Sequence, residues 1–198
     1  MHLEVVPATA ERWALVAALL STGRSAGACW CQWFRQLPAE HDAASVDERR
    51  VALRRRIDAG PPPALLALEG DEPVGWLSLG PAEEFRPRLS RWSVAKGVLD
   101  DATVEGVWVI NCLYVPSERR RTGISGRLIE AAVVHAHRAG ARAVIAFPLL
   151  AEARSLPEGA TGVGYAEPFL AAGFELVPGA LDSRAWAVRR LRPEPPPG

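Results

Sequence analysis

Three consecutive arginines, Arg119–Arg121, stand just before Gly123 and Gly126, where an apolar run meets a long helical pattern. The first backbone N–H groups of a helix lack intrahelical partners and lie at the positive end of the helix dipole, so they attract anions. Glycine lets an anion approach the backbone closely, and arginine donates paired hydrogen bonds to phosphate. This combination indicates a cradle for pyrophosphate. A solvated basic turn, with glycine used for tight packing, is the alternative.

Two better-known phosphate motifs do not fit this stretch. A Walker A loop needs a lysine after its second glycine, and the only lysine of the chain is Lys96. A dinucleotide fingerprint needs three glycines in the spacing G-x-G-x-x-G, whereas Gly123 and Gly126 supply two at another spacing.

The elements that must position this cradle follow from hydrophobic patterning. Residues 106–116 form a continuous apolar run typical of a buried strand, residues 123–138 have a helical pattern, and residues 141–147 form a second apolar run. A strand, a helix and a strand in this order predict a βαβ unit, with the two strands parallel and adjacent. Upstream, residues 64–80 are typical of a β-hairpin.

The rest of the chain predicts further short elements in one domain. We expect a strand near the N-terminus, a helix from Thr9 to Gly23, and a second helix with the capping-box pair Ser45 and Glu48 that ends at Gly60. The remaining expectations are an irregular aromatic segment over 28–38, loops over 81–104 and 148–164, a short helix ending at Gly173, a strand from Phe174 and a last strand over 183–193. We place a single domain at residues 1–192 and a disordered proline-rich tail at 193–198.

The segment Arg120–Ser125 resembles a motif of the GCN5-related N-acetyltransferases (GNAT), R/Q-x-x-G-x-G/A after a strand and opening a helix. Ser125 replaces the last small residue, and Gly126 follows it. The order of elements over residues 64–191 also resembles this family. The resemblance implies an α/β single-domain GNAT fold, with a mixed, mostly antiparallel sheet, a central splayed parallel strand pair and flanking helices. The aromatic segment after residue 28 is similar to a subgroup of bacterial members.

The resemblance also implies acetyl-CoA as cosubstrate. Backbone groups of Leu113 and Val115 would pair with the pantetheine arm as an added strand, and N–H groups after Arg120 would hold the pyrophosphate. The cofactor-binding residues implied are Leu113, Tyr114, Val115, Arg120, Arg121, Thr122, Gly123, Ile124, Ser125 and Gly126.

The catalytic positions of the family are apolar in this sequence. Many members use a glutamate six residues before the valine of the cofactor strand and a tyrosine four residues before the glycine of the "GF" turn. These positions are Val109 and Phe169 here. Substitute proton carriers are Tyr165 and Glu105, with Glu83 and Glu84 as further carboxylates. The alternatives are a packing tyrosine and solvated surface charges.

An aromatic cluster and one amide are candidates for binding the acceptor. The family resemblance places Trp30, Trp33 and Phe34 in one wall of the acceptor pocket, with core packing as the alternative. Asn111 lies in the cofactor strand and would bind substrate or form a buried hydrogen-bonded amide.

The amino-acid composition limits the partners, the cellular location and the metal sites that we expect for this chain. The chain has 198 residues with 23 basic and 23 acidic side chains, which argues against a nucleic-acid partner held by bulk charge. No apolar run is long enough for a transmembrane helix, and the N-terminus does not resemble a signal peptide. The sparse thiols Cys29, Cys31 and Cys112 predict a cytoplasmic location, and their C-x-C spacing does not match a zinc knuckle, so we expect no metal.

The resemblance implies an N-acetyltransferase that moves an acetyl group from acetyl-CoA to a primary amine by direct attack in a ternary complex. The acceptor would be a small-molecule amine or a protein amino group, with no nucleic-acid or membrane partner, and a homodimer is compatible with the sequence. The alternative is a non-catalytic acyl-CoA-binding sensor, which the apolar Val109 and Phe169 favour.

Overall fold

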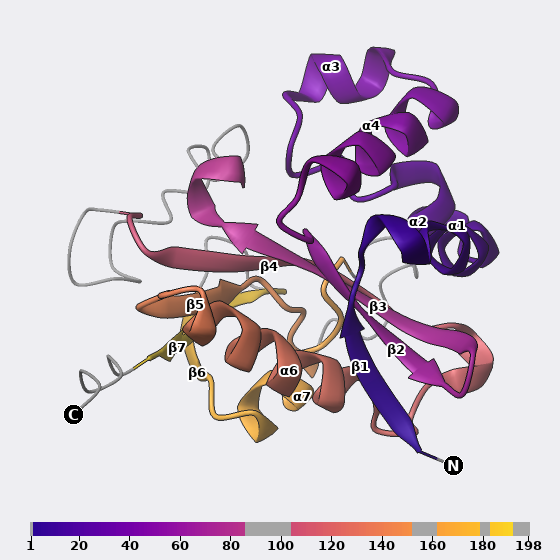
Figure 1. Cartoon of the computed structure of the whole chain (residues 1–198). Helices are drawn as coiled ribbons and strands as arrows, with labels where there is room; N and C mark the ends of the chain where they lie inside the picture. The colour runs from indigo at the N-terminus through magenta and orange to yellow at the C-terminus, as the bar shows by residue number, and fades with distance from the viewer. Residues whose placement is uncertain (1, 86–103, 152–161, 179–182, 192–198) are drawn as a thin grey trace, which may run out of the picture.

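The computed structural model describes residues 2–85, 104–151, 162–178 and 183–191. The predicted tail at 193–198 and most of the predicted loops over 81–104 and 148–164 lie outside these residues. The described chain forms a seven-stranded sheet in the order β1-β2-β3-β4-β5-β7-β6, antiparallel except for the parallel pair β4–β5 (Figure 1). The fold class expected from the sequence is therefore confirmed. The strands are β1 Leu3–Pro7, β2 Ala64–Glu69, β3 Glu72–Pro81, β4 Val107–Tyr114, β5 Ala143–Ala146, β6 Glu175–Pro178 and β7 Ala185–Arg190.

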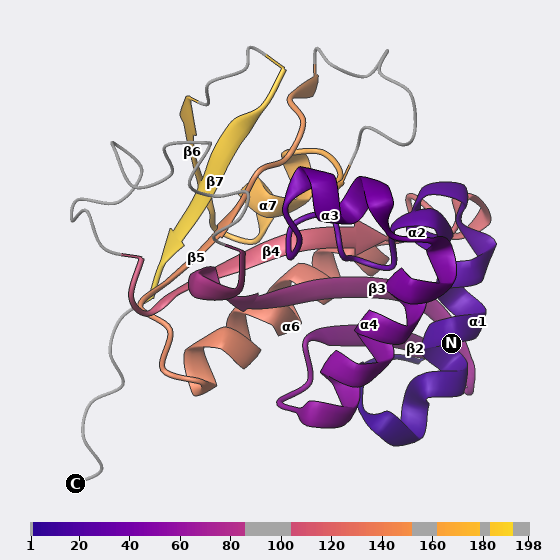
Figure 2. The ribbon, with the colours of Figure 1, turned by 90° about the horizontal axis from the view of Figure 1, so that it is seen from above.

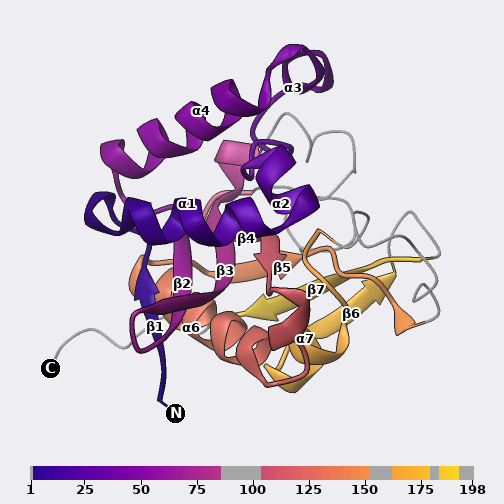
Figure 3. The same cartoon turned by 90° about the vertical axis from the view of Figure 1, so that its right-hand side faces the viewer.

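Helices cover both faces of the sheet. Figure 3 shows α1 to α4 on one face, with α6 and α7 on the other. The helices are α1 Trp13–Thr22, α2 Arg24–Cys29, α3 Pro38–Ala43, α4 Val46–Ala59, α6 Ile124–Arg138 and α7 Glu167–Ala171, with short 3-10 turns at η1 Ala10–Arg12, η2 Ala82–Phe85 and η4 Ser117–Arg119. Among the described residues, no helix combines the length and the apolar character needed to cross a bilayer.

The beginning of α4 has the predicted capping box. The Ser45 hydroxyl accepts a hydrogen bond from the Glu48 backbone N–H at 3.2 Å, and the Glu48 carboxylate accepts one from the Ser45 N–H at 2.7 Å. The predicted irregular segment after residue 28 differs at its start, because Cys29 still belongs to α2. That helix ends at Trp30, whose left-handed conformation stops it.

A glycine in β3 sets the position of α6 on the sheet. A Cβ atom at Gly75 would lie 2.7 Å from Ile124 Cγ2 and 2.9 Å from Leu128 Cδ1. Both contacts are shorter than van der Waals distance, so only glycine lets the first turns of α6 pack this closely. Ile124 and Leu128 are buried in the core between helix and sheet. This close packing fixes the N-terminal end of α6 against β3.

The parallel strands separate partway along their length. β4 pairs with β5 from Val107↔Ala143 to Ile110↔Ala146, after which β5 ends while β4 continues to Tyr114. In the ladder with β3, Ser78 pairs with Cys112 and Leu79 with Ile110, so Asn111 is the extra residue of a β-bulge. In Figure 2, strands β5, β7 and β6 diverge from β3 and β4. We call the space beside β4 beyond Ile110 the splay.

Candidate functional site

The start of α6 has the geometry of an anion site. Gly123 precedes the helix with φ of 86°, and no side chain caps the end. The Gly123 carbonyl accepts the first helical bond from the Arg127 N–H at 3.2 Å, so the N–H groups of Ile124, Ser125 and Gly126 have no intrahelical acceptor. A Cβ atom at Gly123 or Gly126 would meet nothing within 4 Å. An anion can therefore reach these N–H groups.

The three arginines have different surroundings. Arg119 bridges Glu69 and Glu72 of the β2–β3 hairpin at 2.9 and 2.8 Å. Arg120 Nε donates to the Val115 carbonyl at 3.2 Å. Arg121 has φ of 62° and an exposed side chain, without an ion-pair partner in the described part of the chain. Arg119 and Arg120 thus hold the turn in place, and Arg121 is the guanidinium available to a bound phosphate.

A short segment after residue 161 fills the splay. The Leu113 backbone N–H donates to the Gly162 carbonyl at 3.1 Å, and the Leu149 N–H, beyond β5, donates to the Gly164 carbonyl at 2.9 Å. Val163, between the two glycines, is 3% exposed and belongs to the core under α6. Leu113 therefore directs its N–H into the splay, as the added-strand prediction requires, and that N–H already has a partner from the same chain.

Asn111 is an unusual buried side chain at the beginning of the splay. It is 2% exposed, and neither its amide oxygen nor its amide nitrogen has a hydrogen-bond partner among the described residues. A buried amide without partners costs free energy of folding, so such groups are rare in proteins and mark ligand sites or ordered water. The structure places this amide in the bulge, beside the point where β4 and β5 part.

The model of the acetyltransferase (GNAT) family matches residues 27–156, more than half of the chain. The chain belongs to the GNAT family. No curated protein sequence matches it.

Solved GNAT structures share the fold over nearly the whole chain at low sequence identity. An N-acetyltransferase from Staphylococcus aureus Mu50 is 15% identical with a TM-score of 0.56, covering 97% of this chain and 100% of its own. YncA of Salmonella typhimurium, solved with acetyl-CoA, is 14% identical with a TM-score of 0.56, covering 99% and 98%. A polyamine N-acetyltransferase of Drosophila melanogaster is 12% identical with a TM-score of 0.58, covering 96% and 100%. These matches support the GNAT fold.

The two positions that carry catalytic side chains in many GNAT enzymes lie in apolar surroundings. Val109 is 4% exposed and packs with Phe147 of the chain after β5 and with Trp186 of β7. Phe169 is fully buried and meets Phe174 edge-on, with ring centroids 5.3 Å apart. Neither position offers space for a solvated acid or base.

The substitutes for these residues lie at opposite ends of β4. Tyr165 forms a β-bridge with Leu149 and follows directly on the segment that bonds Leu113, so the structure brings it to the splay. Glu105 is exposed before the first residue of β4. From Glu105 to Leu113 the extended chain spans ~26 Å at ~3.3 Å per residue. That separation argues against Glu105 as a group that reaches the reacting atoms.

Glu84 is part of an ion-pair cluster. Its carboxylate contacts the guanidinium of Arg35 and accepts a hydrogen bond from Arg56 at 2.7 Å. Burial alone would raise the pKa of Glu84, but the hydrogen bonds and charges of Arg56 and Arg35 outweigh burial and lower this pKa below its usual value. Glu84 therefore stays ionised and holds η2 against α4, which suits a structural anchor and not a proton carrier. Its neighbour Glu83 is exposed.

The three aromatic residues that were predicted to form the acceptor wall lie in three different environments. Trp30 is buried against Trp13, with ring centroids 6.1 Å apart. Trp33 is 41% exposed and contacts His41. Phe34 packs against the apolar cluster that contains Val109. Of the three, Phe34 reaches the face of β4 on which the usual base of the family would stand.

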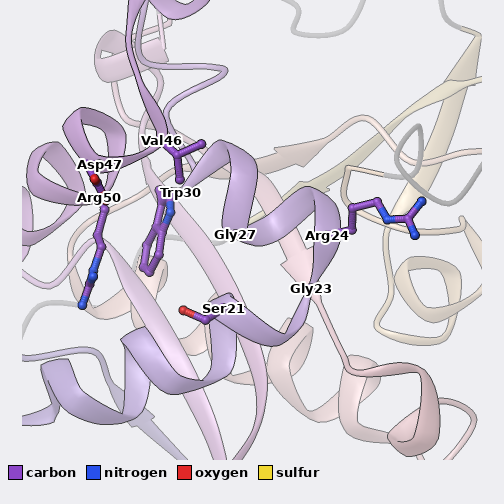
Figure 4. A pocket seen from close by; sticks show the side chains of 8 residues that line it. All are labelled: Ser21, Gly23, Arg24, Gly27, Trp30, Val46, Asp47 and Arg50. Carbon is purple, nitrogen blue, oxygen red and sulfur yellow. The ribbon is translucent and has the colours of Figure 1, made fainter.

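Trp30 instead lines a surface pocket of about 350 Å³ between α1, α2 and α4. Figure 4 shows that Arg24 points away from the other lining side chains. The pocket is lined by Ser21, Gly23, Arg24, Gly27, Trp30, Val46, Asp47 and Arg50, with no residue of β4, β5 or α6. It lies on the α1–α4 side of the sheet, where a Cβ atom at its Gly23 would come within 2.6 Å of the Tyr114 ring.

Two parts of the site were not identified from the sequence. Val163 and its flanking glycines fill the splay although the pattern there indicated only a loop. Phe147, directly after β5, packs beside Val109 and Trp186. Its position was a usable signal, since ligands of α/β sheets bind at the carboxyl ends of parallel strands.

Proposed function

We propose that this protein is an N-acetyltransferase that moves the acetyl group of acetyl-CoA to a primary amine by direct attack. The observation that carries the proposal is the uncapped start of α6 at Gly123, open to an anion, beside a strand that extends past its parallel partner. A pyrophosphate fits the first feature and an extended pantetheine arm fits the second.

Acetyl-CoA would be held by backbone more than by side chains. The N–H groups from Thr122 to Gly126 and the Arg121 guanidinium would bind the pyrophosphate. The Leu113 N–H and the backbone of Val115 would pair with the pantetheine amides once the Gly162 carbonyl is displaced. When bound, the thioester supplies an acetyl group that is activated toward nucleophiles.

Two side chains of the splay would act on the reacting groups. The buried amide of Asn111 would orient the acceptor amine or the acetyl carbonyl, which satisfies an amide that otherwise lacks partners. Tyr165 would donate a proton to the leaving thiolate. No carboxylate of the described residues is assigned as the base, so the amine would lose its proton to water.

The acceptor end of the site is apolar. Phe34, Phe147 and Trp186 gather around Val109 on one face of β4 and β5. An amine carried on an apolar or aromatic group suits these surroundings better than a strongly hydrophilic one. Protein amino groups and polyamines, the latter suggested by the Drosophila relative, are the contrasting acceptor classes.

A non-catalytic acyl-CoA sensor is the second candidate. The apolar Val109 and the fully buried Phe169 favour it, because a sensor needs the cradle without the acid and base. We also propose that residues 1–192 act as one domain, that the protein is cytoplasmic, and that a homodimer is its simplest assembly.

Calorimetric titration with acetyl-CoA and with CoA tests the cradle, followed by a panel of amines in an assay for released CoA thiol. We expect micromolar binding of both ligands and thiol release with apolar or aromatic amines. Binding without thiol release across the panel would favour the sensor. A folded protein that binds neither ligand would overturn both readings.

A further inference from the structure

Two cysteines far apart in the sequence meet on the α1–α4 side of the sheet. Cys31 follows α2, and Cys112 lies on β4 next to Leu113. Both are free thiols that pack in or against one apolar cluster. Cys31 is 3% exposed, whereas Cys112 is only partly buried.

The strand register places the Cys31 sulfur over the β3–β4 face. Trp76 Nε1 donates to Cys31 Sγ at 3.1 Å. Trp76 and Ser78 point to the same side of β3, and Cys112 is the register partner of Ser78. Trp76 and Cys112 are thus diagonal neighbours on one face. Cys31, whose sulfur accepts the Trp76 hydrogen bond, and Cys112 therefore lie on the same face of the sheet, in or against one apolar cluster.

The backbone before this contact is fixed in an uncommon conformation. Trp30 and Cys31 have φ of 48° and 57°, which non-glycine residues seldom adopt. Both side chains are almost fully buried, so packing maintains the conformation. The result is a rigid turn that directs the Cys31 thiol toward β4.

We propose that Cys31 and Cys112 form a site of reversible oxidation, joined as a disulfide by hydrogen peroxide and separated again by thiols. The Cys31 thiolate attacks one peroxide oxygen, the O–O bond breaks, and hydroxide leaves and takes up a proton. The Cys112 sulfur then attacks the resulting sulfenic acid, giving the S–S bond and a second water after the Cys112 proton is transferred. Two thiols are oxidised by two electrons, and one peroxide is reduced to two waters.

The electrostatics of the pair agree with this order of attack. The hydrogen bond from Cys112 lowers the pKa of the Cys31 thiol, and the Trp76 N–H and the Arg35 charge act in the same direction against burial. The shared hydrogen bond and burial raise the pKa of Cys112 well above its usual value. Cys31 is therefore the more acidic thiol and the one that attacks the peroxide, and Cys112 is the resolving thiol.

The test uses the folded, full-length protein, treated with hydrogen peroxide and then blocked in denaturant with N-ethylmaleimide. We expect one alkylated cysteine in place of three, and full reversal by dithiothreitol. Cys29 and Cys31 fall in one tryptic peptide between Arg24 and Arg35, so variants must assign the bridge. Cys29→Ser should keep the disulfide, while Cys31→Ser and Cys112→Ser should each abolish it.

A thermal shift supplies a second readout. A bridge that closes a loop of this length should raise Tm by on the order of 5 to 10 °C in wild type and Cys29→Ser alone. A bridge through Cys29, irreversible oxidation without a bridge, or three unmodified thiols would each overturn the proposal. No acyl-CoA enters the test, so its failure is separate from a failure of the proposed activity.

Discussion

The backbone N–H of Leu113 donates a hydrogen bond to the carbonyl oxygen of Gly162, at an N···O distance of 3.1 Å. Leu113 belongs to the strand that a pantetheine arm would extend, and Gly162 belongs to the segment that precedes α7. The proposed cosubstrate and this segment therefore compete for one N–H group. The segment is anchored by Val163, which is 3% exposed in the core.

A smaller side chain at position 163 should favour CoA binding. Val163→Ala removes buried methyl groups at ~0.8 kcal/mol each, so the segment should leave the splay more readily and CoA should bind up to about tenfold more tightly. Calorimetric titration measures the change. Val74→Ala, a similar deletion in β3 within the same core, should leave CoA affinity unchanged. Weaker CoA binding by Val163→Ala than by Val74→Ala would show that the segment helps to hold the cosubstrate.

The anion site at α6 can be tested with a pair of matched glycines. Gly123→Val fills the open space at the first turn and should lower CoA affinity by about 100-fold or more. Gly140→Val, just beyond the other end of α6, has a similar φ of 82° and equally open surroundings. Both changes force a β-branched residue to positive φ at a cost of about 1–2 kcal/mol, so both should lose similar stability. Equal CoA affinity in the two variants would contradict the cradle.

We expect the Asn111 side chain to lower the stability of the folded protein and to raise its activity. Asn111→Leu replaces a buried amide without partners by an apolar group of similar size, so the free energy of unfolding should rise by about 1 kcal/mol. Thiol release with an accepted amine should fall at least about tenfold. Ser78→Ala is the contrast, because the buried Ser78 hydroxyl does bond the Pro63 carbonyl and its removal should lower stability. If the Asn111→Leu variant were less stable but fully active, Asn111 would have no role in the reaction.

Two substitutions test which tyrosine position donates the proton, one by loss of turnover and one by its recovery. Tyr165→Phe should lower kcat by about 10- to 100-fold with unchanged CoA affinity. Adding Phe169→Tyr, which restores the usual family residue, should not rescue turnover, because that side chain is fully buried against Phe174. The added hydroxyl should instead reduce stability by about 1–3 kcal/mol. Rescue by the double change would place proton donation at the usual family position.

The ion-pair cluster at Glu84 predicts a pH-dependent stability. Glu84→Gln should cost about 1–3 kcal/mol, between the values for exposed and fully buried pairs. Because the pKa of Glu84 is lowered in the folded state, its contribution is present above the unfolded pKa of ~4.3 and is lost as pH falls through the folded pKa. The difference from wild type should therefore be constant near neutral pH and shrink below about pH 4. Denaturant unfolding across this range measures it.

The neighbouring carboxylate supplies the control for that experiment. Glu83→Gln changes the same charge at an exposed position and should shift stability by less than about 0.5 kcal/mol. A Glu84→Gln difference that persists undiminished in acid would mean that the side chain contributes through packing and not through its charge.

The sequence by itself determined the elements and the open, glycine-rich start of α6. The βαβ unit, the capping box of α4 and the glycine start of α6 depend on residues close together along the chain. Hydrophobic period, capping and glycine conformation are local properties, and a sequence records them directly. Family resemblance extended these local signals to a mixed, mostly antiparallel sheet with one parallel pair, which the structure confirms.

Only the tertiary structure decided which side chains meet. Arg119 pairs with two carboxylates of the β2–β3 hairpin, Glu84 is neutralised by two arginines, and Cys31 and Cys112 meet at one apolar cluster. Each of these contacts joins residues from separate elements, and the face on which Cys112 lies follows from the β3–β4 register with its bulge at Asn111. A shift of one residue in register turns a side chain to the opposite face. The partners, the burial and the pKa values of these side chains can therefore be determined only from the assembled sheet.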